Sequence, residues 1–466
     1  MARAKKETAL TPEERLQAAL VPDWEWPYKL PENWCWTRIG NYVDYVTDYV
    51  ANGSFASLKV NVSIFKDENY ALMVKTRDFA NGFTKSLTYT DKHGYDFLSK
   101  STLHGGELIL SNIGSVGKVF RVPYFDRPMT LASNSVMVKC YNSRDYDWMY
   151  YFLLSPIGFE ELKSITTGTA VPKFNKTDLK TIPLPVPPLA EQQRIVDRIE
   201  SLFAKLDEAK EKAQVVVDSF ETRKAAILHK AFTGELTAKW REEHGVGMES
   251  WRTISFKDVC KKITDGTHHS PINTENGEYM YITAKNIKEN GIDLTNITFV
   301  SKDVHEEIYS RCDVQYGDVL YIKDGATTGI ATVNTIDKPF SLLSSVAVLR
   351  PDKKQILAEY MAYNLNSSKT KTMMISSMSG NAITRLTLSK IKAASITICS
   401  LDEQEEIVRL IDHLLGKEQQ TKEAAEIVLD QIELMKKSIL ARAFRGELGT
   451  NDPSEESAVK LLKQII

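Results

Sequence analysis

The strongest constraint on the fold is an internal repeat. Residues 188–236 match residues 400–448 without a gap, and 22 of the 49 paired positions are identical. The first copy opens on LAEQQRIV and closes on AFTGEL, and the second opens on LDEQEEIV and closes on AFRGEL. Chance does not produce this agreement, so the chain arose by duplication.

The remainder of each half repeats more weakly and with gaps. The paired positions include Trp34 and Trp251, Asp48 and Asp265, residues 70–82 and 279–291, residues 106–118 and 317–329, residues 130–139 and 341–350, and residues 164–186 and 376–398. The two halves share framework positions and differ in their loops. We therefore expect the two helices to have the same role, whereas the two modules bind two different targets.

The repeat defines a domain order of module, long helix, linker, module and long helix. We expect an N-terminal extension at 1–30, a first module at 31–187, a first helix at 188–236, a linker at 237–250, a second module at 251–399, a second helix at 400–448 and a C-terminal tail at 449–466. Each module is long enough to hold a core of its own.

Both repeated segments have the heptad spacing of a coiled coil. In the first copy, apolar residues from Ile195 to Phe220 alternate in steps of four and three. Arg223 takes the next slot, and with Ile227 the seam covers roughly 33 residues, or about 50 Å. A capping box fits Ser400 and Glu403, and Gly234 and Gly446 stand where helix ends favour a left-handed residue.

We expect the two long helices to form an antiparallel pair, since this relates the two halves of the chain by a two-fold axis. The alternatives are a parallel pair, or helices that pack on their own modules or between chains.

The modules are expected to be mixed α/β. Short strands are predicted at 108–111, 135–138, 181–186, 319–322, 346–349 and 395–398, and helices at 148–154 and 356–366. The predicted fold class is therefore α+β: two globular α/β modules separated by two long helices in an antiparallel coiled coil, with a pseudo-two-fold internal duplication.

Composition limits the classes of function. The formal net charge is −2, so no global basic field indicates a nucleic-acid partner, and such contacts must come from local patches. The five cysteines are scattered and favour a reducing compartment without a zinc site. No signal peptide or run of about 18 apolar residues is present, so we expect a cytoplasmic protein without a membrane span.

Several loops mix small, amide, hydroxyl and basic residues at matching places in both modules. Such residues can neutralise phosphates or read base edges, although each loop alone is most simply a solvated surface. The candidate DNA-binding residues are Lys75, Arg77, Ser115, Lys118, Lys173, Asn175, Lys176, Lys285, Asn286, Lys288, Lys323, Thr327, Thr328, Asn381, Thr384 and Arg385.

No motif indicates catalysis or a metal site. The segment GSVGK fails as a phosphate-binding loop, since Asn112 stands where the first glycine is required and Val119 replaces Ser or Thr. It is better explained as a tight glycine turn. The pair His268–His269 has no third ligand at metal spacing and is expected in a surface loop. We therefore expect no catalytic residue and no bound metal or cofactor in this chain.

The arrangement resembles a known family. A module that ends in IPLPVPPLAEQ, a long helix that opens on AEQQRIV and closes on AFTGEL, the GSVGK turn and the duplicated order are together similar to the specificity (S) subunit of type I restriction–modification systems. The second copy has CSLDEQEEIV and KDGATTG at the corresponding places. The resemblance covers nearly the whole chain.

The resemblance implies a non-catalytic subunit that recognises double-stranded DNA. Each module would be a target recognition domain that reads one half of a split, asymmetric site, and the helices would set the spacing. Two methyltransferase (M) subunits would dock on the chain, and two restriction (R) subunits would join them. S-adenosylmethionine, ATP and Mg would bind to those partners, whose complex methylates adenine at N6 and cleaves DNA.

Two other functions are compatible with parts of the pattern. A coiled-coil scaffold would use the same helices to bind proteins rather than DNA, and its complex would ignore sequence in competition binding. An enzyme in its own right would need catalytic motifs that the sequence does not offer.

Overall fold

The computed structural model describes residues 11–378 and 385–466. The chain divides into two compact units, Met1–Lys212 with Val428–Ile466, and Ala213–Ile427. Each unit therefore combines one module with parts of both long helices. Among the described residues, no helix is long and apolar enough to cross a membrane.

The first unit contains three sheets. The order β2-β9-β6-β7 is antiparallel, β4-β3-β8-β5 contains a parallel β3–β8 pair, and β1 pairs antiparallel with β10. The strands are β1 (Cys35–Arg38), β2 (Tyr45–Asp48), β3 (Ala71–Val74), β4 (Tyr89–Thr90), β5 (Thr102–Leu103), β6 (Leu108–Ser111), β7 (Val119–Arg121), β8 (Met129–Leu131), β9 (Ser135–Lys139) and β10 (Pro183–Val186). The helices are α1 (Pro12–Ala19), η1 (Asp23–Glu25), α2 (Ile39–Tyr42), η2 (Tyr49–Asn52), α3 (Phe55–Asn61), η3 (Thr76–Asn81), α4 (Lys92–Phe97), η4 (Ser99–Ser101), α5 (Ser143–Leu154), α6 (Pro156–Ser164), α7 (Lys176–Leu179) and α17 (Ala458–Ile465).

The second unit repeats the main sheets of the first. The antiparallel sheet β12-β20-β17-β18, the parallel β13–β19 pair and the antiparallel β11–β21 pair correspond to β2-β9-β6-β7, β3–β8 and β1–β10. The strands are β11 (Arg252–Ser255), β12 (Cys260–Asp265), β13 (Tyr279–Ile282), β14 (Ile287–Lys288), β15 (Gly291–Ile292), β16 (Thr298–Val300), β17 (Val319–Ile322), β18 (Ala331–Val333), β19 (Ser341–Leu342), β20 (Val346–Pro351) and β21 (Ser395–Ile398). The helices are α9 (Phe220–Phe232), α10 (Ala238–Glu243), α11 (Phe256–Val259), η5 (Ala284–Asn286), α12 (Lys302–Arg311), α13 (Ala358–Asn366), α14 (Ser368–Ser376) and α15 (Leu388–Ala393). The weak repeat in the sequence is thus a repeat of topology.

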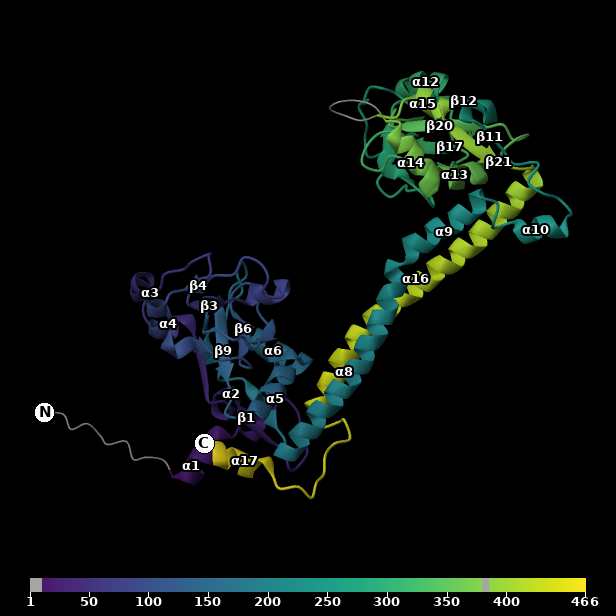
Figure 1. Cartoon of the computed structure of the whole chain (residues 1–466). Helices are drawn as coiled ribbons and strands as arrows, with labels where there is room; N and C mark the ends of the chain where they lie inside the picture. The colour runs from purple at the N-terminus through teal and green to yellow at the C-terminus, as the bar shows by residue number, and fades with distance from the viewer. Residues whose placement is uncertain (1–10, 379–384) are drawn as a thin grey trace. The chain divides into compact units, whose positions relative to one another are not determined.

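The long helices run antiparallel within each unit, as expected. They are α8 (Leu189–Asp218), which continues into α9, and α16 (Leu401–Ala443) (Figure 1). In the first unit, Lys210 contacts Glu433 at 2.6 Å and Lys436 reaches back to Asp207. In the second unit, Arg223 contacts Glu418 at 2.6 Å. As the residue numbers along the first long helix fall, those of the residues they contact on the second long helix rise. Only an antiparallel pair produces this order.

The first long helix is interrupted at one residue, although the repeat predicts one continuous helix. The break lies at Ser219, between α8 and α9, whereas α16 is continuous. The Ser219 hydroxyl donates to the carbonyl of Val215, a bond that bends helices, and the Arg223 guanidinium donates to the Val216 carbonyl at 3.1 Å. The second copy has Gln431 in place of Ser219 and lacks this hydroxyl.

Part of the predicted seam packs on the modules as well as on the other helix. Ile199 belongs to the core of the first module and Ile411 to the core of the second, and both are fully buried. The end of the second long helix also packs on a module. The centroid of the Phe444 ring, directly after α16, lies 4.5 Å from that of Trp148 in the first module. Each module core is therefore completed by the start of one long helix and the end of the other.

Equivalent residues join each module to the helix that follows it. The indole of Trp34 donates to Glu191 at 2.8 Å, and that of Trp251 donates to Glu403 at 2.9 Å. Ser400 caps its helix through the Glu403 backbone N–H at 3.3 Å. The Glu403 carboxylate bonds elsewhere, so only half of the predicted capping box forms. The predicted left-handed glycines are confirmed at Gly234 (φ 83°) and Gly446 (φ 72°).

The two equivalent glutamates have different partners, which predicts different effects of the same substitution. Burial raises the pKa of Glu191, so its ionised form costs stability at neutral pH. It faces amide and hydroxyl groups that a glutamine can satisfy, Asn451 at 2.8 Å and Thr450 at 3.4 Å. Glu403 instead meets the nearly buried guanidinium of Arg241.

We expect Glu403→Gln to lower the free energy of unfolding by about 3 kcal/mol, since it leaves the Arg241 charge buried and uncompensated. Glu191→Gln is the matched control and should change that free energy by less than about 1 kcal/mol. Urea unfolding of both variants, followed by near-ultraviolet circular dichroism, measures the difference. Equal midpoints would show that the buried ion pair contributes nothing.

Candidate nucleic-acid interface

Two candidate loops of the first module are joined by backbone hydrogen bonds. The Gly114 N–H donates to the Pro172 carbonyl at 2.9 Å, and the Phe174 N–H donates to the Asn112 carbonyl at 3.1 Å. This pairing brings the turn with Ser115 and Lys118 beside the segment with Lys173, and all three side chains are exposed. The predicted glycine turn is confirmed, because Gly114 and Gly117 both have positive φ.

Asn175 and Lys176 already have partners within the first module. The Asn175 carbonyl oxygen accepts from the Asp178 N–H at 2.9 Å and so caps α7. The Lys176 ammonium contacts the Asp48 carboxylate at 2.8 Å and is 31% exposed. Both side chains therefore have a structural role in addition to any contact with DNA.

Lys75 and Arg77 lie in one turn of the same module, and Arg77 lines an open cavity. The fully buried Asp78 fixes this turn, because its carboxylate accepts from the Lys75 N–H at 2.8 Å. Burial and the nearby Arg77 lower the pKa of Lys75. The Arg77 side chain is 59% exposed and lines the cavity, of about 540 Å³, with Lys66 and Ser86.

In the second module, Asn286 is 2% exposed, and both ends of its amide are engaged. Its oxygen accepts from the Thr283 N–H at 3.1 Å, and its nitrogen donates to the Asp293 carbonyl at 3.1 Å. This holds the turn that carries Lys285 and Lys288, whose side chains are exposed. These two lysines are the groups of this turn that are open to a ligand.

The KDGATTG segment has one buried and one exposed part. The Lys323 side chain is 8% exposed and contacts Asp324 at 2.9 Å. Thr328 is nearly buried and donates to the Gly325 carbonyl at 2.7 Å, while Thr327 is exposed. Backbone bonding of residue 386 to the Lys323 carbonyl brings the exposed Arg385 beside this segment. The candidates Asn381 and Thr384 lie outside the described residues.

Asp48 and Asp265, paired in the repeat, occupy the same place at the ends of β2 and β12. In the first module Asp48 contacts Lys176, the first residue of α7. In the second, Asp265 contacts Lys323 at 3.4 Å and Arg311 at 3.0 Å. The same position of the framework thus contacts different basic residues in the two modules. The sequence analysis did not select Asp265 or Arg311, although the pairing of Asp48 with Asp265 was a usable signal.

The described residues offer no metal centre. No group of three or more His, Cys, Asp or Glu side chains within that part of the chain could hold a metal ion. His268 and His269 lie in an exposed loop, as expected, and His268 approaches Asp265 at 3.5 Å.

The comparisons with known proteins agree on one family. The model of the type I restriction modification DNA specificity domain matches residues 40–216 and 248–427. The type I restriction enzyme EcoBI specificity subunit of Escherichia coli is 26% identical over 344 residues, which are 69% of this chain and 71% of that protein. The EcoKI specificity subunit of the same species is 24% identical over 335 residues, or 68% and 70%. The MjaVIII specificity subunit of Methanocaldococcus jannaschii is 23% identical over 90% of this chain and 94% of that protein.

Solved structures support the same fold. A chain from a study of complex assembly and conformational transition of the type I R-M system matches with a TM-score of 0.66 and 19% identity, over 91% of this chain and 100% of that one. The HsdS subunit of Thermoanaerobacter tengcongensis matches with a TM-score of 0.56 and 18% identity, over the same shares.

Proposed function

Because the chain belongs to the family of type I restriction–modification DNA specificity subunits, we propose that its two modules read the two halves of a bipartite, asymmetric DNA site. The chain is the DNA specificity subunit, with two target recognition domains and no catalysis of its own. One observation carries the proposal. The two modules have corresponding sheets, but different residues stand at the equivalent positions of these sheets. A two-fold pair of identical readers would instead require a palindrome.

We propose that residues 31–187 and 251–399 form the recognition domains, with the other boundaries as expected from the repeat. The antiparallel pairs β1–β10 and β11–β21 close each of these segments at its two ends. A domain closed in this way can differ in its loops without disturbing the helices, which suits a subunit whose specificity is set by its modules.

The exposed basic residues of the candidate loops are proposed to contact the DNA backbone. They are Arg77, Lys118, Lys173, Lys285, Lys288 and Arg385. Such contacts position a protein on DNA, while hydroxyl and amide groups in the same loops can meet base edges. The net charge of −2 is compatible with this role if partner subunits share the phosphate contacts.

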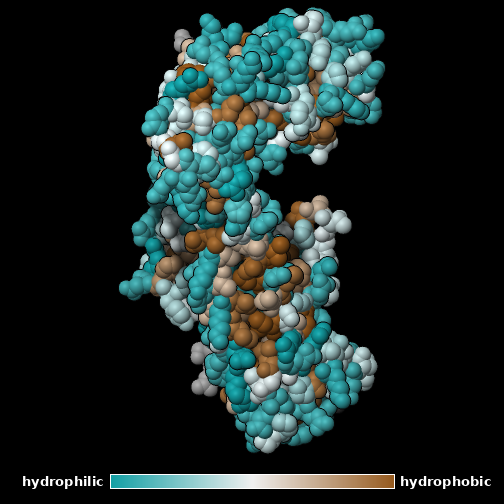
Figure 2. All heavy atoms as spheres, turned by 90° about the vertical axis from the view of Figure 1, so that its right-hand side faces the viewer, coloured by the Kyte–Doolittle hydropathy of each residue, from teal (hydrophilic) through white to brown (hydrophobic). Residues whose placement is uncertain are grey.

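The long helices are proposed to set the spacing between half-sites and to dock two methyltransferase subunits. The equivalent residues Val215 and Ile427 are 65% and 57% exposed, so both copies leave an apolar position uncovered. Figure 2 shows a face of the chain on which apolar residues form a broad area within a hydrophilic surface. Exposed apolar areas of this kind mark protein interfaces. Two restriction subunits complete the proposed complex, and S-adenosylmethionine, ATP and Mg belong to the partners.

The test is a map of methylated adenines in cells that express this chain with the methyltransferase of its system. We expect methylation in two short, unlike sequences separated by a spacer of constant length. Deleting the chain should abolish it. Methylation within one contiguous palindrome, or methylation that persists without the chain, would contradict the proposal.

A further inference from the structure

The second module contains a polar pocket at the end of β12. Its volume is about 790 Å³, within the usual range of ligand sites, and it is open to solvent. Its lining includes two carboxylates, Asp265 and Asp324, and the cations Arg311, Lys323, Arg385 and Lys392. The pocket therefore offers hydrogen-bond donors and acceptors together.

One side of the Arg311 guanidinium is bonded to the protein, and its other side is open to solvent. Its Nη2 donates to the Asp265 carboxylate at 3.0 Å, to the Asp265 carbonyl at 3.2 Å and to the Gly266 carbonyl. Its side chain is still 53% exposed. Within the described residues, its Nε and Nη1 have no hydrogen-bond partner, so their N–H groups remain available to a ligand.

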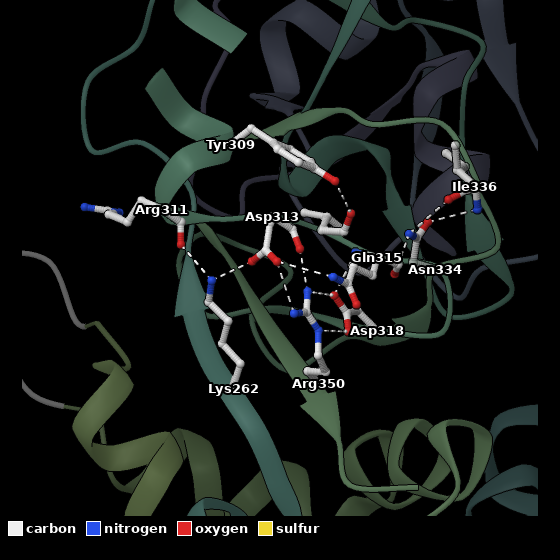
Figure 3. Close-up of polar contacts among 10 residues, drawn as sticks. Lys262, Tyr309, Arg311, Asp313, Gln315, Asp318, Asn334, Ile336 and Arg350 are labelled. Carbon is white, nitrogen blue, oxygen red and sulfur yellow. Dashed lines mark hydrogen bonds and ion pairs between the residues drawn. The ribbon is translucent and has the colours of Figure 1, made fainter. Parts of the chain in front are cut away.

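The backbone of Arg311 is fixed by an adjoining network of charged residues. Its carbonyl accepts from Lys262 at 3.1 Å, and Lys262 also contacts Asp313. Arg350 donates two bonds to Asp318, at 2.9 and 3.0 Å, and two to Asp313, one to the carboxylate at 3.2 Å and one to the carbonyl. Figure 3 shows that the Arg311 side chain points away from this network. Since its position is set before a ligand arrives, little conformational entropy is lost on binding.

The carboxylates indicate which part of DNA fits the pocket. Asp265 is 4% exposed and faces Lys323 at 3.4 Å and His268 at 3.5 Å. One oxygen of Asp324 contacts Lys323, and the other is buried with no partner among the described residues. A backbone phosphate could bond to the cations of the lining, but it has no hydrogen-bond donor to offer the two carboxylates. A base edge presents donors and acceptors together and can pair with both kinds of group.

We propose that Arg311 reads a base in the half-site of the second module, with Asp265 as the residue that positions it and Asp324 as an acceptor beside it. The inference rests on the proposed function and names the residue that sets specificity at one position. The first module has Asp48 and Lys176 in the corresponding place, which is consistent with a different base there.

The test uses the complex of the full chain with its methyltransferase subunits. Its substrates are duplexes that carry every single-base substitution in both half-sites. For Arg311→Ala we expect discrimination at one position of one half-site to fall by about tenfold or more, with the other positions unchanged. Arg311→Lys keeps the charge and the contact with Asp265 but loses the second donor group, so it should relax the same position.

Arg252→Ala is the matched control, because Arg252 is an exposed arginine of the same module that does not line the pocket. It should leave discrimination intact. Circular dichroism and assembly with the methyltransferase verify the fold of each variant. The inference is overturned if both Arg311 variants keep full discrimination at every position, or weaken methylation equally for all sequences. If the unsubstituted complex shows no sequence preference, the proposed function itself fails.

Discussion

We expect the replacement of Ile411 by Asp to abolish folding of the second unit. Ile411 lies on α16, is fully buried and belongs to the apolar core that also contains Tyr360 and Ile396. The substitution removes apolar burial and places a carboxylate among apolar side chains without a partner. The combined cost exceeds about 4 kcal/mol, comparable with the whole stability of a typical domain.

Ile427→Asp, on the same helix, is the control for this experiment. Ile427 is 57% exposed, so the substitution should change the free energy of unfolding by no more than about 0.5 kcal/mol. It should nevertheless weaken methyltransferase assembly if the exposed apolar face is the docking face. Urea unfolding and size-exclusion chromatography with the methyltransferase measure the two effects separately. An Ile411→Asp protein as stable as the unsubstituted chain would show that this helix face is not part of a core.

Exchanging residues 31–187 for the first module of another specificity subunit should replace one half of the methylated site completely. The other half should stay as it was, since the second module has its own sheets and its own core. The incoming module must keep a tryptophan at the place of Trp34, whose indole joins the module to Glu191 of the helix. The spacer should stay the same, because the helices are unchanged.

Methylation mapping of the exchanged protein gives the result directly. The control exchanges the same segment for the module of a subunit that reads the same half-site, and it should leave the map unaltered. A change in both halves would show that the modules do not read independently. An unchanged map would show that residues 31–187 carry no specificity.

Sequence reasoning placed the framework well because the framework follows from periodicity. The strands predicted at 108–111, 319–322 and 395–398 have the bounds of β6, β17 and β21. The antiparallel helices followed from the duplication. The break at Ser219 did not, because a single hydroxyl that bonds to its own helix leaves the apolar spacing unchanged.

The tail and the ends of the seam depend on tertiary packing that no local pattern indicates. Residues 449–466 were expected to be a tail, yet they contain α17, whose Ala458 and Leu462 are fully buried in the core of the first module. Ile199 and Ile411 fit a coiled-coil seam by spacing, but the cores that bury them combine residues of a module with residues of the other long helix.

The candidate recognition residues were harder to predict, because a polar residue in a loop can be exposed or bonded. Asn286 and Lys323 fit the composition of a contact loop, yet both are buried, Asn286 against nearby Asp293 and Lys323 against the distant Asp265. Arg311 was missed because Asp265, which holds it, lies 46 residues away and no motif links them.

The central claim is that the modules recognise DNA sequence, and competition binding tests it most directly. The complex of the full chain with its methyltransferase is bound to a labelled duplex carrying the mapped site. It is then challenged at physiological salt with duplexes in which one half-site is scrambled. The account predicts that either scrambled half weakens competition by about a thousandfold or more, in the range that separates specific from non-specific DNA binding. Equal competition by intact and scrambled duplexes would contradict it.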